Sequence, residues 1–325
     1  MKEVKRPINL ILDTDIGGDC DDACALALIH SLCDRGEAKL LAVTHCFSGS
    51  SYAGCIDAIN TYCGRPGIPV GVFPPETPQV KTGVDIYASR LKNEFPNAYK
   101  QNQQPENTLS LLRRTLAASD EPVTLIAIGS MFSMAKLLES SADEFSALDG
   151  RQLVAEKVER IVIMGGRFHE TWPKPYVLAD NYVVDAEFNI IADIPAAQSL
   201  CRLCPVELVF CSYEIGWDII TGKPMMEKGK DNNPMRLAYQ IVTNGYGRES
   251  WDLATVLYAI RPDAGDWQRH EMGKITVDDQ GVTRWEAAEN GKHTYLLIKR
   301  DPAEIRQEMD DLLVAVSVKH EEDNP

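Results

Sequence analysis

Basic residues are scarce in this sequence of 325 residues. Lysine and arginine total 33 against 48 aspartates and glutamates, so the formal net charge is -15 at pH 7. Nucleic acids and anionic membrane surfaces are bound through basic patches, and this balance therefore argues against both as partners. A small neutral substrate is compatible with such a charge.

Long apolar runs are also missing. No stretch approaches the roughly 20 apolar residues of a membrane-spanning helix. The apolar segment before the first aspartate, residues 8–12, is too short for the core of a signal peptide and instead predicts a first strand. We therefore expect a cytoplasmic protein with no membrane partner.

Paired cysteine motifs are nearly absent as well. The nine cysteines include one CxxC, Cys201 to Cys204, and no second pair or histidine cluster that would complete a zinc site. A zinc site there stays open as an alternative, although ordinary thiols are favoured. The odd count indicates reduced cysteines in a cytosolic protein rather than a disulfide framework.

What the sequence does contain is an alternation of strand and helix patterns. Short apolar runs, β-branched or rich in leucine, are typical of strands buried on both faces. They alternate with amphipathic stretches, which predicts an α/β fold with a single open, mostly parallel sheet flanked by helices. The predicted strands are 8–12, 40–44, 123–128, 160–164 and 207–210, and the predicted helices are 22–34, 52–63, 108–118, 131–140 and 195–202.

Two long polar segments, residues 73–107 and 166–186, interrupt this order, and their length favours site-forming loops or lids. The C-terminal region predicts a small antiparallel extension, because GKITVDDQGVTRWE is a plausible hairpin with DDQG as its turn. Without an internal repeat or linker, we expect a single domain over residues 1–325. The other C-terminal elements predicted are a helix at 249–260, a strand at 295–299 and a proline-started helix at 302–316.

The stretch LILDTDIGGDCDDACAL (10–26) contains five aspartates between positions 13 and 22. Crowded carboxylates repel one another, so either a cation lies among them or some hold protons. Asp13 and Asp15 end the first predicted strand, at the sheet edge where open α/β folds bind ligands. Asp21 and Asp22 begin the next helix, whose dipole favours acids there and accounts for one or two of the five. A divalent cation that prefers oxygen ligands, Ca²⁺ or Mg²⁺, accounts for the whole group.

Two other motifs share parts of this string. An EF-hand loop starting at Asp13 is excluded, because Gly17 takes a ligand position and Cys24 takes the position of the bidentate glutamate. Phosphatases of the haloacid dehalogenase type also place Asp-x-Asp after a first strand, with the first aspartate as nucleophile, and LDTDIG matches that loosely. This alternative leaves the three later aspartates without a role and is disfavoured.

The acidic stretch most resembles the N-terminal motif of the nucleoside hydrolase family, the calcium-dependent inosine-uridine-type N-ribohydrolases, which is Asp-x-Asp-Pro-Gly-x-Asp-Asp-Ala. Here it stands as DTDIGGDCDDA, with Ile16 for the proline and two additional residues before the aspartate pair. The resemblance implies the Rossmann-like fold of that family. Three further segments match in the order the family requires: IAIGSMFSMA (126–135), IMGG (163–166) followed by NYVVDAEFN (181–189), and SWDLATVLYAI (250–260).

The resemblance also implies hydrolysis of the N-glycosidic bond of a ribonucleoside, or a related N-riboside, to free base and ribose. Asp15, Asp22 and Asp252 would ligate Ca²⁺, together with the main-chain carbonyl of Ile128. Asp15 would also act as the general base toward the calcium-bound water, because a bound cation acidifies water and orients the sugar diol.

The family's sugar contacts fall on four residues of this sequence. Asp21 would accept a hydrogen bond from a ribose hydroxyl, and Asn181, Glu187 and Asn189 would hold the remaining hydroxyls. The resemblance also implies that Asn189, like Asp15, is a catalytic residue. Glu187 and Asn189 lie two residues apart, on one side of a segment expected to be extended, and this spacing favours sugar binding over a plain surface role.

The two extra residues leave the register of the acidic loop open. Asp19 keeps the family's separation from Asp15, whereas Asp21 and Asp22 keep the Asp-Asp-Ala sequence that opens the helix. We favour the pair, because a rigid helix fixes ligands better than a Gly-Gly loop does. Asp19 is then predicted to lie behind the ligands or face solvent, and Asp13 to be a structural carboxylate bonded by backbone amides.

On the leaving-group side, Trp251 replaces the histidine that many family members place before the late aspartate. Tryptophan cannot donate a proton at neutral pH but can stack on a base, so it is predicted to bind the substrate. Trp172, Tyr182, Tyr213, Tyr239 and Tyr246 could form an aromatic wall, although each of them alone is more simply explained as a packing residue. His169 is a weak candidate acid, with a solvated loop histidine as the favoured alternative.

The altered loop and Trp251 keep a second hypothesis open, a non-catalytic nucleoside- or ribose-binding protein on the same scaffold. In either case the expected partner is a small-molecule nucleoside and the expected cofactor is Ca²⁺. Because relatives are commonly dimers or tetramers, we also expect a homo-oligomer by analogy.

Overall fold

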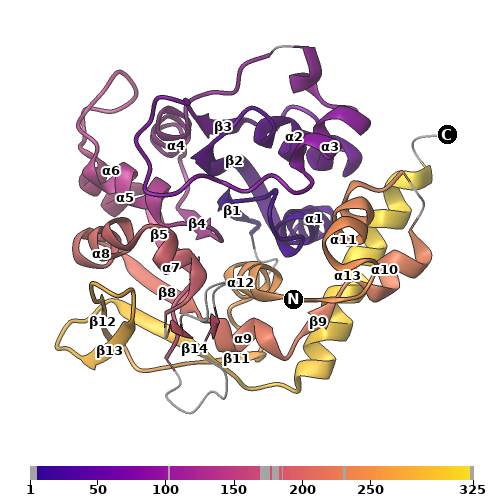
Figure 1. The fold of residues 1–325 in the computed structure, drawn as a ribbon. Coiled ribbons are helices and arrows are strands. Elements are labelled where there is room, and N and C mark those ends of the chain that lie inside the picture. The colour runs from indigo at the N-terminus through magenta and orange to yellow at the C-terminus, as the bar shows by residue number, and fades with distance from the viewer. Residues whose placement is uncertain are drawn as a thin grey trace.

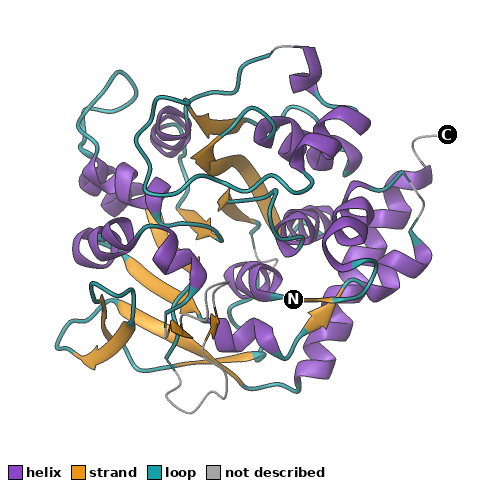
Figure 2. Cartoon of the chain, in the orientation of Figure 1, coloured by secondary structure: helices purple, strands orange, loops and turns teal. Residues whose placement is uncertain are grey.

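The computed structural model describes residues 6–101, 103–168, 176–177, 183–184, 186–229 and 232–322. A central sheet is covered by helices on both faces (Figures 1 and 2). Within the described residues the sheet has ten strands. In spatial order these are β13 (Thr283–Ala287), β12 (Gly273–Val277), β14 (His293–Ile298), β8 (Glu207–Cys211), β5 (Val158–Met164), β4 (Val123–Ala127), β1 (Ile8–Thr14), β2 (Ala38–Ser48) and β3 (Val70–Phe73), with β11 (Trp267–Arg269) paired to β14.

The strand order places the start of the chain in the middle of the sheet. From β1 the chain proceeds outward through β2 and β3, and then returns to the other side of β1 as β4, all in parallel pairing. The order therefore reverses between β1 and β4, which is the position where open α/β sheets bind ligands. Antiparallel pairings of β11, β12 and β13 extend the sheet beyond β14. The predicted α/β fold with an antiparallel C-terminal extension is confirmed.

Helices form the layers on either side of the sheet (Figure 2). Two short strand pairs lie outside the main sheet: β6 (Tyr176–Val177) with β7 (Val183–Val184), and β9 (Ile220–Thr221) with β10 (Arg248–Glu249). None of the helices in the described part of the chain combines the length and apolar character needed to cross a membrane. The helices are α1 (Asp21–Asp34), α2 (Tyr52–Tyr62), α3 (Ala88–Glu94), the 3₁₀ turn η1 (Ala98–Gln101), α4 (Thr108–Ala117), α5 (Phe132–Glu139), α6 (Gly150–Lys157), α7 (Phe188–Ala192), α8 (Ile194–Leu203), α9 (Tyr213–Trp217), α10 (Lys223–Lys228), α11 (Pro234–Thr243), α12 (Trp251–Ile260) and α13 (Pro302–Glu322).

The alternation of side chains along the strands fills a core on each side of the sheet. Leu10 and Leu12 of β1 point into a cluster shared with α1, α2, α12 and α13, whereas Ile11 points into a second cluster shared with α4, α5, α6 and α8. In α1, every residue from Asp21 to Leu32 is buried. A helix without a polar face must be enclosed on all sides, and α1 is enclosed by the sheet, α12 and α13.

The five predicted parallel strands and the predicted hairpin are all present, with ends that differ by a few residues. The structure adds β3, which was missed because Gly71 weakens its strand pattern. That glycine lets α4 approach the sheet, since a Cβ at Gly71 would lie 3.0 Å from Thr108 Cα. The segment 73–107, expected to be a loop, contains α3 and η1, and the final helix continues from Pro302 to Glu322. All nine cysteines, including Cys201 and Cys204, are free.

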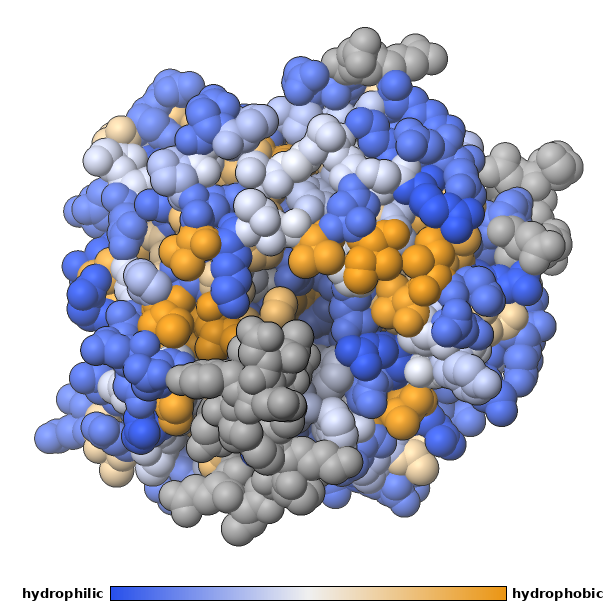
Figure 3. Space-filling model, viewed as in Figure 1, coloured by the Kyte–Doolittle hydropathy of each residue, from blue (hydrophilic) through white to orange (hydrophobic). Residues whose placement is uncertain are grey.

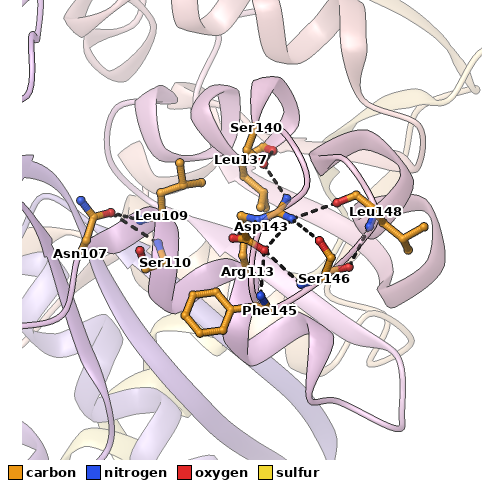
Figure 4. Close-up of polar contacts among 10 residues, drawn as sticks. All are labelled: Asn107, Leu109, Ser110, Arg113, Leu137, Ser140, Asp143, Phe145, Ser146 and Leu148. Atoms are coloured by element: carbon orange, nitrogen blue, oxygen red, sulfur yellow. Dashed lines mark hydrogen bonds and ion pairs between the residues drawn. The ribbon is translucent and has the colours of Figure 1, made fainter.

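A buried arginine joins α4 to the loop between α5 and α6 (Figure 4). The Arg113 side chain is only 2% exposed, and its guanidinium donates at 2.6 and 3.0 Å to the two carboxylate oxygens of Asp143. It also donates to the Ser140 hydroxyl and to the carbonyls of Ser146 and Leu148. One side chain thus satisfies several acceptors of a loop that has no regular structure of its own.

We expect Arg113→Met to lower the free energy of unfolding by about 3 kcal/mol, because the methionine leaves Asp143 and the loop carbonyls without their donor. The urea midpoint of unfolding measures this change. The matched control is Arg6→Met, which removes an ion pair to Glu121 whose side chains are 84% and 59% exposed. Exposed pairs contribute little, so the control should change stability by less than about 1 kcal/mol. Equal effects of the two substitutions would contradict this account.

Candidate active site

A pocket of about 360 Å³ opens where the strand order reverses. Asp15 follows β1 and Ile128 follows β4, and both line it. The pocket floor carries carboxylates, whereas the wall is mostly apolar and aromatic. Apolar side chains gather on both sides of the central hollow in the space-filling view (Figure 3). The other lining residues are Gly18, Asp19, Asp21, Asp22, Phe47, Lys81, Thr82, Gly83, Val84, Ile86, Met164, Glu187, Phe188, Asn189, Ala192, Tyr213, Val242, Arg248, Trp251 and Asp252.

Three carboxylates from distant parts of the chain meet on the floor. Asp21 and Asp22 open α1 and Asp252 lies in the first turn of α12, and each offers an oxygen within 4.8 Å of the others. All three are buried. Burial, followed by the charges of the neighbouring aspartates, raises the pKa of each well above its usual range. Such a group could hold a metal ion, whose charge would offset the repulsion.

The cluster is held by local hydrogen bonds at two helix starts. The Thr14 hydroxyl donates to Asp22 and accepts from the backbone N–H of Ile16 at 3.0 Å. The backbone N–H of Asp252 points at the Asp21 carboxylate, 3.3 Å away. Each of these acids also lies at the positive end of a helix dipole, which favours carboxylates there. Both helices therefore direct their first acidic residues toward the same point.

Asp15 is half-buried beside this cluster. Burial is the main cause that raises its pKa to about 7, and the charge of Asp19 adds to it. Gly129, which follows β4, packs directly against Asp15. A Cβ at Gly129 would lie 2.9 Å from the Asp15 backbone nitrogen, from Asp15 Oδ1 and from Cys46 Sγ. Only glycine lets the chain after β4 pass this close to Asp15.

Glu187 and Asn189 line the pocket, but the extended segment expected for them is wrong. Glu187 is the N-cap of α7: its carboxylate accepts from the backbone N–H groups of Asn189 at 2.8 Å, Ile190 at 3.2 Å and Gly166 at 3.3 Å. Burial raises its pKa to about 7 despite these bonds. The Asn189 amide donates to the carbonyl of Ile128 at 3.2 Å. A capping turn, not a strand, therefore brings the two side chains together.

The two remaining aspartates of the loop have partners that the sequence did not suggest. Asp13 accepts from the Thr44 hydroxyl at 2.6 Å, and its other carboxylate oxygen has no partner among the described residues. The expected backbone amides are thus replaced by a side chain, because the neighbouring strand β2 places Thr44 directly opposite. Asp19 pairs with Arg248, whose Nη2 lies 2.5 Å from Asp19 Oδ2. Arg248 was not predicted, although an excess of acids beside a pocket is a general signal for a nearby cation.

The aromatic wall contains fewer of the predicted residues than expected. Trp251 begins α12, its indole N–H donates to the carbonyl of Tyr213 at 2.8 Å, and the two rings stack with centroids 5.5 Å apart. Tyr239 is fully buried in the core, so it has the packing role that was favoured for each aromatic residue taken alone, and it is not part of the wall. Tyr246 is 75% exposed and does not line the pocket. Asn181, His169, Trp172 and Tyr182 lie outside the described residues.

The long segment 73–107 does form part of the site. Val84 and Ile86 line the pocket, and the backbone N–H of Ile86 donates to the carbonyl of Gly17 in the acidic loop at 2.8 Å. The Tyr87 hydroxyl donates to the carbonyl of Asp19 at 2.7 Å. These contacts fix the acidic loop from outside, as expected for a site-forming segment.

Comparison with known proteins gives consistent matches across this fold. Residues 10–320 match the family model described as inosine-uridine preferring nucleoside hydrolase. The inosine-uridine preferring nucleoside hydrolase of Crithidia fasciculata is 25% identical over 297 residues, covering 83% of this chain and 86% of that protein. The pyrimidine-specific ribonucleoside hydrolase RihA of Shewanella sp. (strain ANA-3) is 28% identical over 218 residues, which are 65% of this chain but only 60% of the relative.

Solved structures share the fold at lower identity. The inosine-uridine preferring nucleoside hydrolase from Bacillus anthracis has a TM-score of 0.69 at 16% identity, covering 95% of this chain and 99% of that one. The purine-preferring ribonucleoside hydrolase from Gardnerella vaginalis has the same TM-score at 17% identity, with the same coverage. Because the family model matches nearly the whole length, this chain belongs to the inosine-uridine preferring nucleoside hydrolase family, a family of hydrolase enzymes.

Proposed function

We propose that this protein hydrolyses the N-glycosidic bond of ribonucleosides, releasing free base and ribose, with Ca²⁺ held at the acidic cluster. Family membership supports the reaction. The observation that carries the proposal is the meeting of Asp21, Asp22 and Asp252 beside Asp15 on the floor of one pocket. Several ionised carboxylates buried this close together destabilise the fold, and a bound cation would neutralise their repulsion.

The donor set fits a hard divalent cation. The cluster offers carboxylate oxygens only, and among the described residues no histidine or cysteine joins it. Such sets favour Ca²⁺ or Mg²⁺ over zinc. The proposed ligands are Asp15, Asp22, Asp252 and the carbonyl of Ile128, which accepts one hydrogen bond from Asn189 and keeps a second lone pair. When bound, the ion would acidify water and orient the ribose diol.

Asp15 is the proposed general base. It takes a proton from the attacking water while the water oxygen bonds to C1′ of the ribose and the bond to the base breaks. A pKa of about 7 suits proton transfer near neutral pH, and a neighbouring cation would lower it again. Geometry beside the cleaved bond therefore matters more for Asp15 than its basicity does.

Asp21, Glu187 and Asn189 are proposed to hold the sugar, and Asn189 is also grouped with the catalytic residues. The Glu187 carboxylate has about four lone-pair positions, of which three accept backbone N–H groups. One position remains for a ribose hydroxyl, and the three backbone bonds fix its direction. Asn181 stays a prediction for the same role.

Release of free ribose from a panel of purine and pyrimidine nucleosides tests the proposal. We expect release that stops when EGTA removes the metal and returns when Ca²⁺ is restored. Calorimetry separates the enzyme from a binding protein. Calcium-dependent nucleoside binding without any ribose after hours would contradict hydrolysis and favour the binder.

Gly129→Ala should lower the rate of ribose release by about 10²-fold, because the added methyl group pushes Asp15 away from its position. Overpacking should lower the free energy of unfolding by only about 1–3 kcal/mol, so the protein remains folded. Steady-state kinetics alongside a urea titration measures both. A variant with the normal rate would show that the position of Asp15 is not critical.

We also propose single-domain subunits that form a homo-oligomer, dimer or tetramer, in the cytoplasm. Light scattering coupled to size-exclusion chromatography tests the assembly, with a mass of twice or four times the subunit as the expected result.

A further inference from the structure

Arg248 lines the pocket and belongs to β10, a strand far from the acidic loop in sequence. Its Nε lies 2.9 and 3.1 Å from the two carboxylate oxygens of Asp19, which is 229 residues away in sequence, and its Nη1 lies 2.7 Å from Glu249. The side chain is 30% exposed and lines the pocket. Two carboxylates therefore fix the orientation of one guanidinium at the edge of the site.

A guanidinium carries five N–H donors, and these contacts do not use all of them. The Nε–H and one hydrogen on each Nη bond to Asp19 and Glu249, which leaves one N–H on each Nη. The guanidinium carbon lies 5.0 Å from the centre of the Trp251 ring, so the flat group rests against that indole. Trp251 is itself held by its hydrogen bond to Tyr213. The remaining donors are thus preorganised.

Trp251 directly precedes Asp252 of the carboxylate cluster. Trp251 and the guanidinium of Arg248 that rests against it therefore border the place proposed for the ribose. Glu187 caps α7 and Asn189 lies in its first turn, whereas Arg248 belongs to β10, the partner strand of β9. In the view of Figure 1, α12 is drawn between α7 and β9. The other cation of the pocket, Lys81, lies over Phe188 of α7, 5.7 Å from the ring centre. Arg248 therefore borders the pocket beside Trp251, on a different element from the one that carries Asn189.

Cleavage of an N-glycosidic bond leaves an electron pair on the nitrogen of the departing base. Trp251 cannot supply a proton to it, and the described pocket lining contains no histidine or cysteine that could do so instead. The one tyrosine of that lining, Tyr213, stacks against the Trp251 ring. Hydrogen bonds aimed at a developing negative charge in a partly buried site lower the barrier without any proton transfer.

We propose that Arg248 is a further catalytic residue, which donates its free N–H groups to the departing base and stabilises the negative charge that develops there. This inference rests on the proposed function. The C1′–N bond breaks with its electron pair passing to the base, the water oxygen bonds to C1′, and the water proton passes to Asp15. The base anion then takes a proton from solvent. The substrates favoured are N-ribosides whose base leaves as an anion with acceptor atoms on its edge.

The test compares two leaving groups in the holoenzyme with Ca²⁺. Inosine and uridine release bases that are poor leaving groups, whereas 4-nitrophenyl riboside releases a phenolate that is stable without help. Arg248→Met should lower kcat for the nucleosides by about 10²–10³-fold and change kcat for the nitrophenyl riboside by less than about threefold. Arg248→Lys keeps the positive charge but loses the planar pair of N–H donors. Its kcat for the nucleosides should be about tenfold higher than that of Arg248→Met.

The matched control is Arg65→Met, which removes an ion pair to Asp34 with a similarly exposed arginine side chain, 26% against 30%. It should leave both rates unchanged. Equal losses on both substrates in Arg248→Met would mean that the residue only holds the site together and would overturn the proposal, as would unchanged nucleoside rates. If the unmodified protein cleaves neither substrate, the proposed function itself fails, and this inference with it.

Discussion

Asp15→Ala is expected to lower the rate of ribose release by about 10⁴-fold or more, the upper range for loss of a general base. The substitution removes the proposed proton acceptor and, at the same time, one proposed ligand of the cation. Steady-state ribose release at saturating Ca²⁺ measures the loss.

Asp13→Asn is the matched control for this substitution. Asp13 is fully buried at the end of the same strand, and its hydrogen bond from the Thr44 hydroxyl can be accepted equally well by an asparagine carbonyl. Asp13 does not line the pocket. We therefore expect the Asp13→Asn variant to release ribose at a rate within about tenfold of that of the unmodified protein. A phosphatase of the dehalogenase type would give the opposite result, with phosphate release that depends on Asp13. Substantial ribose release by Asp15→Ala would refute the assignment of the base.

Removal of the metal is expected to make stability strongly dependent on pH. Burial raises the folded-state pKa of Asp15 from 3.8 to about 7 and that of Glu187 from 4.5 to about 7. The folded protein then holds protons that the unfolded chain has released. The stability these groups contribute is complete below about pH 4 and is lost as the pH rises through about 7. In EGTA, the free energy of unfolding should therefore fall by a few kcal/mol between about pH 5 and about pH 8.

Calcium should remove most of this loss, because it binds the ionised carboxylates of the folded state. At a free concentration 100 times Kd, it adds about 2.7 kcal/mol to the free energy of unfolding. Urea titrations at both pH values, with and without Ca²⁺, measure the effect. Asp22→Asn provides the comparison: it removes one buried charge, so the metal-free variant should lose less stability at high pH and gain less from Ca²⁺. Stability in EGTA that rises with pH would contradict this assignment of buried acids.

The parallel strands and the location of the site could be predicted from the sequence because both depend on local patterns. A run such as residues 8–12, apolar on both faces, forms a strand wherever it lies in a sheet, and the ligands follow from which strand ends are adjacent. The contact of Asp21 and Asp22 with Asp252 could be predicted only from the family resemblance. Asp21 and Asp252 are 231 residues apart, and no sequence pattern predicts contact at that separation. The structure brings all three together.

The features that were missed depend on contacts between distant segments. Arg248 is an ordinary polar residue in sequence, and its role at the pocket follows only from β10 lying opposite Asp19. Glu187 and Asn189 were placed in an extended segment because their spacing of two fits a strand, whereas the carboxylate caps a helix of five residues, too short for its own periodicity to be recognised. Tyr239 was named as a possible wall residue by type alone, and it is enclosed in the core, the packing role that was the favoured alternative.

The enclosure of α1 has a consequence for how the protein is made. This helix leaves the ribosome more than 200 residues before α12 and α13, which cover it. At typical translation rates of about 5–20 residues per second, its leucines and alanines wait roughly 15–60 s for their cover. During that interval the nascent chain exposes an apolar helix that begins with two aspartates. We therefore expect the chain to need chaperones that bind unfolded segments until α13 has been synthesised.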